Sequence, residues 1–184
     1  MTAVEDKKVK TLVEMTSVKL QCSSPDRELV VFPRWHCFQS KNEYQTPQFV
    51  KFFIENREPY KVAYTVKARE KIFRIDTACG ILECGERRVL KLFLISADDW
   101  PLAINEYTQR RLKLAVESLR IPNDIQPDNL KEATQMSKAI WKRSINEWPL
   151  ERLYTKINVT LISSNPSAQT AAVPLVPVSP KIGA

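Results

Sequence analysis

The sequence predicts an all-β fold, a sandwich of about seven short strands with one short helix before the last strand. Three observations lead to this prediction. Apolar and polar residues alternate over several short segments, turn-forming residues separate those segments, and only one stretch changes to the period of a helix. Because strands and helices do not alternate along the chain, a parallel sheet covered by helices is not expected.

The clearest alternation runs from Phe49 to Leu94, where each segment places its apolar side chains on one face of an extended strand. Turns are expected at 56–59 and around Gly80 and Gly85, because Asn, Pro and Gly favour backbone geometries that strands avoid. The region 34–47 is the least periodic part and is expected to be a loop. The main expected strands lie at 48–55, 60–67, 72–76, 87–95, 111–119 and 156–162, with weaker candidates at 11–22, 29–32 and 37–39.

One stretch, 127–144, has the helical period, and Asp128 is placed to cap its first turn. Its apolar side chains form a stripe that suits packing on the sandwich. The stripe consists of Leu130, Ala133, Met136, Ile140 and Trp141. The segment 98–107 is expected to be a loop. The aromatic residues expected in the core are Phe52, Phe53, Tyr64, Phe73 and Trp141.

A chain of 184 residues, 43% hydrophobic and 27% charged, has the composition of a soluble globular domain with appendages. We expect a flexible arm at 1–13, the sandwich domain at 14–164 and a Pro-rich disordered tail at 165–184. Apolar runs fall far short of the roughly 20 residues of a membrane span. The amino end has acidic residues beside its lysines and does not resemble a secretory signal, so a cytoplasmic protein is expected.

The residues that usually carry catalysis or bind metals are sparse. The cysteines are expected to be free thiols in a reducing compartment, and the spacing of Cys79 and Cys84 does not suit zinc. His36 is the single histidine and is expected to be a partly buried structural residue. Three glycines in the whole chain provide no phosphate-binding loop. We therefore expect no enzyme, no catalytic residue, no metal and no cofactor.

The chain carries 28 Lys and Arg against 21 Asp and Glu, a formal net charge of +7. Phosphate binding rests on clustered basic residues. Here the basic residues form only dipeptides, such as 87–88 and 110–111, and acidic residues lie among them. The sequence therefore does not favour a nucleic-acid partner. A basic nucleic-acid-binding domain is kept as the third of three functional interpretations.

Several motifs occur in a recognisable order. They are FFIENREPYKVAYTVKAREKIFRI at 52–75, DTACGILECGE at 76–86, LKLAVESLRIP at 112–122, Trp141 in the expected helix, and TKINVTLIS at 155–163. Together they resemble the major sperm protein (MSP) domain family over roughly residues 14–164. The resemblance implies an immunoglobulin-like seven-stranded β-sandwich that binds proteins and has no enzymatic activity.

The family includes nematode sperm proteins that assemble into a motility cytoskeleton and VAMP-associated proteins that bind acidic, double-phenylalanine peptides. The resemblance to the second group implies a peptide-binding face. Its residues here would be Lys67, Lys113 and Lys156, with Ala115 in place of a methionine and Arg69, Lys71 and Arg111 nearby. The family's Thr-Thr pair is Ala68-Arg69 in this chain.

Two interpretations therefore stand ahead of the nucleic-acid one. The first is a soluble cytoskeletal, assembly or scaffold protein whose partner is itself or a related MSP domain. The alternative is an adaptor that binds acidic peptides of the double-phenylalanine type on a basic strand face.

Overall fold

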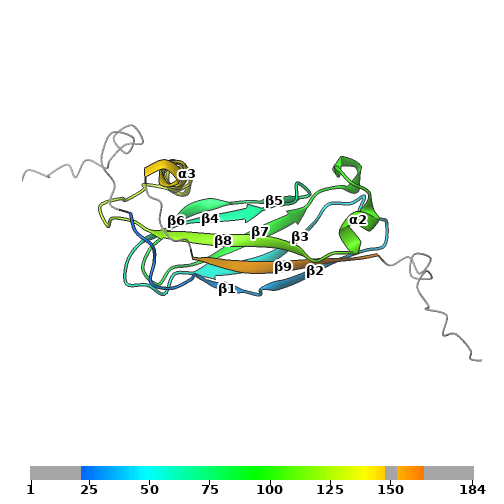
Figure 1. The fold of residues 1–184 in the computed structure, drawn as a ribbon, viewed down its shortest axis with the longest axis horizontal. Helices are drawn as coiled ribbons and strands as arrows, with labels where there is room; N and C mark the ends of the chain where they lie inside the picture. Colours follow the sequence, from blue (N-terminus) through cyan, green and yellow to red (C-terminus); the bar gives the residue numbers. More distant parts are fainter. Residues whose placement is uncertain (1–21, 148–152, 164–184) are drawn as a thin grey trace, which may run out of the picture.

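The computed structural model describes residues 22–147 and 153–163, in which nine strands form two β-sheets (Figure 1). The predicted amino-terminal arm, nearly all of the candidate strand at 11–22 and the predicted tail lie outside the described residues. Sheet I has the order β1 (Val30–Phe32), β3 (Gln48–Glu55), β7 (Arg87–Leu94), β5 (Phe73–Ile75). Sheet II has the order β2 (Trp35–Ser40), β9 (Tyr154–Ser163), β8 (Leu112–Arg120), β4 (Val62–Ala68), β6 (Cys79–Leu82).

The order β1-β3-β7 in one sheet and β9-β8-β4 in the other is the arrangement of an immunoglobulin-like sandwich. The predicted immunoglobulin-like sandwich is therefore confirmed, although the described residues form nine strands where seven were expected. Most pairs are antiparallel, whereas β2 runs parallel to β9. The chain passes from sheet I to sheet II between β1 and β2, where a cis peptide bond precedes Pro33.

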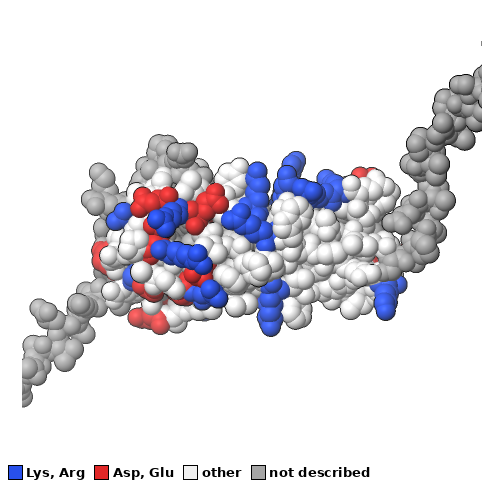
Figure 2. Space-filling view, turned by 90° about the horizontal axis from the view of Figure 1, so that it is seen from below, with Lys and Arg blue, Asp and Glu red and all other residues white. Residues whose placement is uncertain are grey.

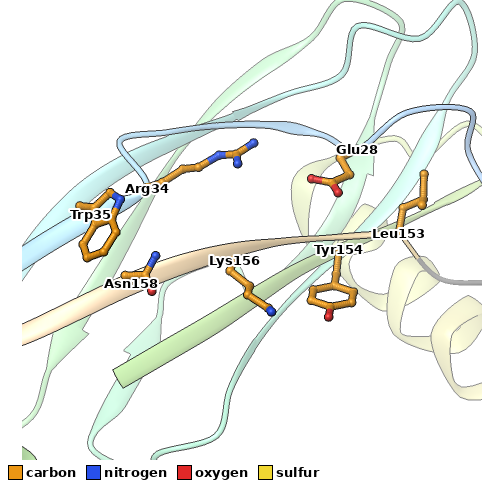
Figure 3. Close-up of a pocket in the computed structure, with 7 residues that line it drawn as sticks. All are labelled: Glu28, Arg34, Trp35, Leu153, Tyr154, Lys156 and Asn158. Atoms are coloured by element: carbon orange, nitrogen blue, oxygen red, sulfur yellow. The ribbon is translucent and has the colours of Figure 1, made fainter. Parts of the chain in front are cut away.

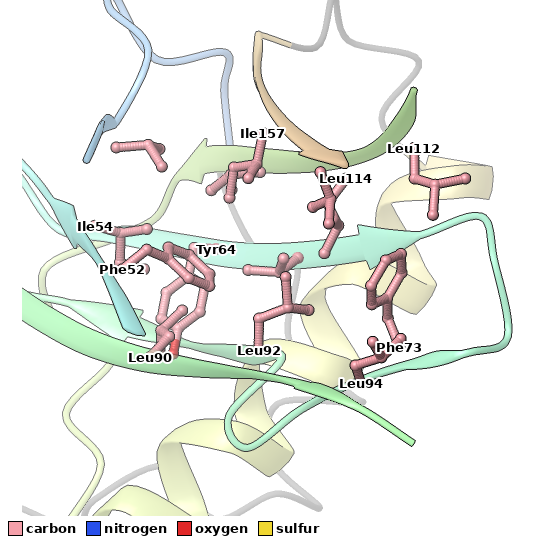
Figure 4. Close-up of a cluster of buried hydrophobic side chains, with 14 of the residues drawn as sticks. Phe52, Ile54, Tyr64, Phe73, Leu90, Leu92, Leu94, Leu112, Leu114 and Ile157 are labelled. Atoms are coloured by element: carbon pink, nitrogen blue, oxygen red, sulfur yellow. The ribbon is translucent and has the colours of Figure 1, made fainter. Parts of the chain in front are cut away.

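The core lies between the sheets and is built from the inward-facing residues of both (Figure 4). The predicted alternation is confirmed in β3, where Phe52 and Ile54 are buried and Phe49 and Lys51 are exposed. Four of the five aromatic residues expected in the core are buried, namely Phe52, Tyr64, Phe73 and Trp141. The prediction for Phe53 is wrong: its ring lies on the outer face of sheet I, where the Arg87 guanidinium lies 4.2 Å from the ring centre.

Two regions predicted as loop or turn contain more strand than expected: β2 extends the weak candidate strand at 37–39 within the predicted loop 34–47, and β6 lies in a predicted turn. β2 is a regular strand, and its inward positions are taken by His36, Phe38 and Ser40. Two of these three are polar, which hides the alternation in the sequence. The Ser40 hydroxyl is satisfied locally, because it accepts a hydrogen bond from the Tyr44 N–H at 2.7 Å and donates one to Asn42.

β6 was not expected, because Gly80 reads as a turn residue in the sequence. Gly80 instead lies inside this edge strand, directly opposite Tyr64 of β4. A Cβ atom at Gly80 would lie 2.7 Å from a carbon of the Tyr64 ring, so the close packing of that ring requires glycine here. Gly85 is a turn residue as predicted, with a φ of 74°. The turn after β3 is also confirmed, and the Asn56 side-chain amide binds the carbonyls of Tyr60 and Glu83.

The helix α3 (Leu130–Glu147) covers one end of the outer face of sheet II (Figure 1). It has 18 residues, so it is longer than the short helix expected. Four of the five predicted stripe residues are buried. The prediction for Leu130 is wrong, because its side chain is 53% exposed. The stripe packs on the outward side chains Ala63, Ile81 and Leu119 and forms a second apolar cluster.

The cap of α3 also differs from the prediction. The Asn129 side chain, not Asp128, accepts the Glu132 N–H at 3.0 Å, while the Glu132 carboxylate accepts the Asp128 N–H. This reciprocal pair has the logic of a capping box. The predicted loop 98–107 overlaps two short helices, the 3₁₀ helix η1 (Ala97–Asp99) and α2 (Ile104–Thr108). Tyr107 is fully buried against Trp100, so tertiary packing holds a helix too short to form alone.

Candidate functional site

The part of the outer face of sheet II that α3 leaves uncovered carries a row of three residues on neighbouring strands. Lys67 on β4 lies opposite Ala115 on β8, and Ala115 lies opposite Lys156 on β9. Lys113 follows on β8, two residues from Ala115 and therefore on the same face. Since neighbouring strands are about 4.8 Å apart, the two flanking lysines stand about 10 Å apart with only a methyl group between them.

This arrangement produces an open hollow of about 280 Å³, which we call the notch. It is lined by Lys67, Ala68, Arg69, Lys113, Leu114, Ala115, Tyr154 and Lys156. Five of the seven residues predicted for the peptide-binding face therefore come together: Lys67, Arg69, Lys113, Ala115 and Lys156.

The other two predicted residues lie outside the notch. Lys71 is exposed in the turn between β4 and β5. Arg111 directly precedes β8, and its guanidinium lies 4.7 Å from the centre of the Trp35 ring on β2. Tyr154 was missed by the sequence analysis. It lies two residues before Lys156 on the same strand face, so extending the alternation of the last strand backward would have found it.

The charge of the notch is positive. Lys67 forms an ion pair with Glu117, 2.9 Å between Nζ and Oε2, and its ammonium lies 5.5 Å from the centre of the Trp141 ring of α3. The Lys156 ammonium lies 5.4 Å from the centre of the Tyr154 ring. Lys113, Lys156 and Arg69 form no ion pair with any other residue in the described part of the chain.

A second open hollow, of about 580 Å³, adjoins the notch and shares Tyr154 and Lys156 with it. β2 begins at Trp35, opposite Asn158, and among the described residues no strand pairs with the earlier residues of β9 on that side. Figure 3 shows Arg34 and Glu28 on one side of β9 and Lys156 and Tyr154 on the other. The Thr155 hydroxyl donates to the Glu28 carboxylate at 2.8 Å.

Charge is unevenly spread over the surface. Figure 2 shows most of the acidic residues of that view gathered at the end of the molecule where α3 lies, while the middle carries Lys and Arg among uncharged residues. The acidic end contains ion pairs such as Arg87 with Glu55 and Lys61 with Glu83.

His36 and the four cysteines were expected to have no catalytic role. His36 is 7% exposed, its ring centre lies 6.0 Å from that of Phe52, and burial lowers its pKa. The four cysteines are free thiols. Within 22–147 and 153–163 no three His, Cys, Asp or Glu side chains converge as a metal site would require. Across these same residues, no helix combines the length and apolar character needed to cross a membrane.

Comparisons with known proteins give structural matches only. No protein-family model matches the sequence, and no curated protein does. Similar solved structures include WR4 of C. elegans, with a TM-score of 0.47 and 14% identity, over 74% of this chain and 97% of that one. They also include SSP-19 of C. elegans, with a TM-score of 0.47 and 13% identity, over 72% of this chain and 99% of that one.

WR4 is an MSP family member, and SSP-19 is a member of an MSP-domain-like family. A third similar structure is the PapD-like domain 7 of human CEP192, with a TM-score of 0.41 and 12% identity, over 80% of this chain and 94% of that one. The first two structures come from the family that the sequence motifs resemble.

Proposed function

We propose that this protein is a non-enzymatic protein-interaction module of the MSP type that captures an extended acidic peptide in the notch. The observation that carries the proposal is the row Lys67–Ala115–Lys156, with Lys113 beside it. Cations stand around a small apolar floor, which suits a ligand that combines carboxylates with an apolar side chain.

The contacts follow from the placement of the side chains. Carboxylates of the ligand would approach Lys113 and Lys156, which have no described acidic partner. An apolar side chain would lie on Ala115, and Tyr154 would form one wall. Because Ala115 is smaller than the methionine implied by the family pattern, it leaves more room above the strand for an apolar ligand side chain. The adjoining hollow continues the basic surface past Lys156 toward Arg34.

Lys67 should contribute less to ligand binding than Lys113 and Lys156. Its ammonium is already paired with Glu117, so a ligand carboxylate gains from Lys67 only by displacing that partner. Lys113 and Lys156 therefore carry most of the attraction in this proposal.

The test is a calorimetric titration of the full chain with an acidic double-phenylalanine peptide. Exposed ion pairs are worth about 0.2–1 kcal/mol, and reversal replaces attraction with repulsion, so Lys113→Glu or Lys156→Glu should weaken binding roughly two- to thirty-fold each. The matched control is Lys51→Glu, an exposed lysine on the outer face of sheet I. Equal affinity in all three variants would refute the proposal.

Self-assembly, the cytoskeletal or scaffold role, is the second candidate. It is favoured by β2, an edge strand of six residues that pairs with β9 on one side and with no other described strand on the second side. An unpaired edge is a template for another chain. Sedimentation at increasing concentration should then show oligomers, and a strict monomer at high concentration would count against this role.

A further inference from the structure

The outer face of sheet I carries a second surface, which we call the aromatic face: Phe32, Phe49, Phe53 and Phe93 with Lys51 and Lys91. The strand register orders it in rows. Phe32 lies opposite Phe53, Lys51 opposite Lys91, and Phe49 opposite Phe93. Phe32 is 62% exposed and Phe49 is 53% exposed. The face thus presents two aromatic pairs with a pair of lysines between them.

The rings present their faces to cations. The Arg87 guanidinium lies 4.2 Å from the centre of the Phe53 ring, and the Lys91 ammonium lies 5.5 Å from the centre of the Phe49 ring. The paired rings are tilted rather than stacked, with centres 5.8 Å apart for Phe32 and Phe53 and 5.7 Å apart for Phe49 and Phe93. A flat group that stacked on one of these ring faces would take the place of the cation.

The centre of the face is positively charged. Lys51 and Lys91 are directly opposite each other, and neither forms an ion pair with another residue of the described chain. Two carboxylates lie nearby, and neither forms an ion pair with Lys51 or Lys91. Glu55 binds Arg57 and Arg87, and the Asp76 carboxylate accepts the backbone N–H of Lys91 at 3.0 Å. Like charges directly opposite on a sheet are unfavourable, so an anion between these lysines would relieve their repulsion.

The position of the lysines limits the ligand. A second copy of this face would bring four lysines together. A lipid surface suits an apolar centre with cations at the rim, whereas here the cations lie between the apolar rows. The ligand must deliver negative charge between two flat groups. Phe49 and Phe53 lie four residues apart on β3, about 13 Å, with Lys51 halfway.

We propose that the aromatic face binds single-stranded nucleic acid, with bases stacked on the phenylalanine rings and phosphate at the Lys51–Lys91 pair. Stacking platforms with interspersed cations bind single strands in this way without sequence preference. The outward positions of β3 and β7 carry no amide or hydroxyl side chain that could read base edges. The lysines and aromatic residues are dispersed in the sequence, and only the pairing of β1, β3 and β7 gathers them.

The test measures fluorescence anisotropy of a labelled oligouridylate of about 12 nucleotides with the full chain at about 50 mM and about 200 mM salt. Phe49→Leu and Phe53→Leu keep apolar bulk but remove the ring, and each should weaken binding by about five-fold or more. Lys51→Gln should reduce the slope of log affinity against log salt by about 0.7. A duplex of the same sequence should compete poorly, because its bases are already stacked.

Matched controls lie in the notch on the opposite sheet. Tyr154→Leu and Lys113→Gln remove an aromatic ring and a charge there and should leave oligouridylate affinity unchanged. Three results would overturn the proposal: no binding at the lower salt concentration, unchanged affinity in both leucine variants, or an equal loss in the notch variants. Unchanged affinity in the leucine variants, with loss in Lys51→Gln, would show attraction of phosphate to the lysines without base stacking, and this too would overturn the proposal. Thermal unfolding of each variant verifies that the fold is retained.

Discussion

Replacing Gly80 with alanine should destabilise the sandwich through one steric contact. The new Cβ would lie 2.7 Å from a Tyr64 ring carbon and 2.8 Å from both the Tyr64 hydroxyl and an Arg88 guanidinium nitrogen. Arg88 ends a flexible side chain and can shift. Tyr64 cannot shift easily, because it is fully buried and its hydroxyl donates to the Thr77 carbonyl at 3.1 Å.

Two opposing contributions determine how much Gly80→Ala changes the free energy of unfolding. Overpacking of a rigid core typically costs about 1–3 kcal/mol. Alanine also reduces the conformational entropy of the unfolded chain relative to glycine, which returns about 0.4–1 kcal/mol. The expected net loss in the free energy of unfolding is therefore about 0–2.6 kcal/mol, with a midpoint of about 1.3 kcal/mol.

Urea denaturation with a double-mutant cycle tests the cause. If Tyr64 is the obstacle, Gly80→Ala should cost much less in a Tyr64→Leu background, where the ring is gone. Gly85→Ala is the contrast: nothing lies within 4 Å of its Cβ, but φ is 74°, so its cost of about 1–2 kcal/mol comes from the backbone and should not change with Tyr64. Additive effects of Gly80→Ala and Tyr64→Leu would refute the steric argument.

Three further outcomes are expected. Burial lowers the pKa of His36 from its ordinary value of 6.5. Below pH 6.5 the unfolded chain therefore takes up the proton before the folded chain does, and the free energy of unfolding should fall as the pH drops. His36→Leu should flatten this pH dependence, measured by urea titrations at several pH values. Asn129→Ala removes the cap of α3 and should cost about 1 kcal/mol in thermal or urea unfolding, whereas Asp128→Ala should cost less. Ala115→Trp fills the notch and should abolish acidic-peptide binding in calorimetry while thermal unfolding stays near the wild-type midpoint.

The sequence predicted those strands that have one buried and one exposed face. In β3, β7, β8 and β9 that condition holds along most of the strand, and the apolar period appears directly in the residues. It fails in β2, where polar His36 and Ser40 face inward, and in β6, whose glycine is required by a ring from another strand. α2 depends on the burial of Tyr107 beneath it, which is a tertiary effect.

The candidate sites differ in what the sequence could predict. The lysines of the notch could be named in advance because the family resemblance supplied them, and strand register then explains why Lys67, Ala115 and Lys156 meet. The aromatic face could not be predicted in the same way. Whether Phe49 and Phe93 are neighbours depends on how β3 pairs with β7, and local sequence carries no information about that pairing.

The two surfaces lie on opposite outer faces of the sandwich, with the core of sheets I and II between them. Their side chains alternate with core residues on the same strands: Lys113 and Ala115 flank buried Leu114, and Lys51 and Phe53 flank buried Phe52. The packed core therefore holds the outward residues of each face in place. The outward residues of one face do not contact those of the other. Substitutions on one surface should leave binding at the other intact, which is why each face supplies the matched controls for its opposite.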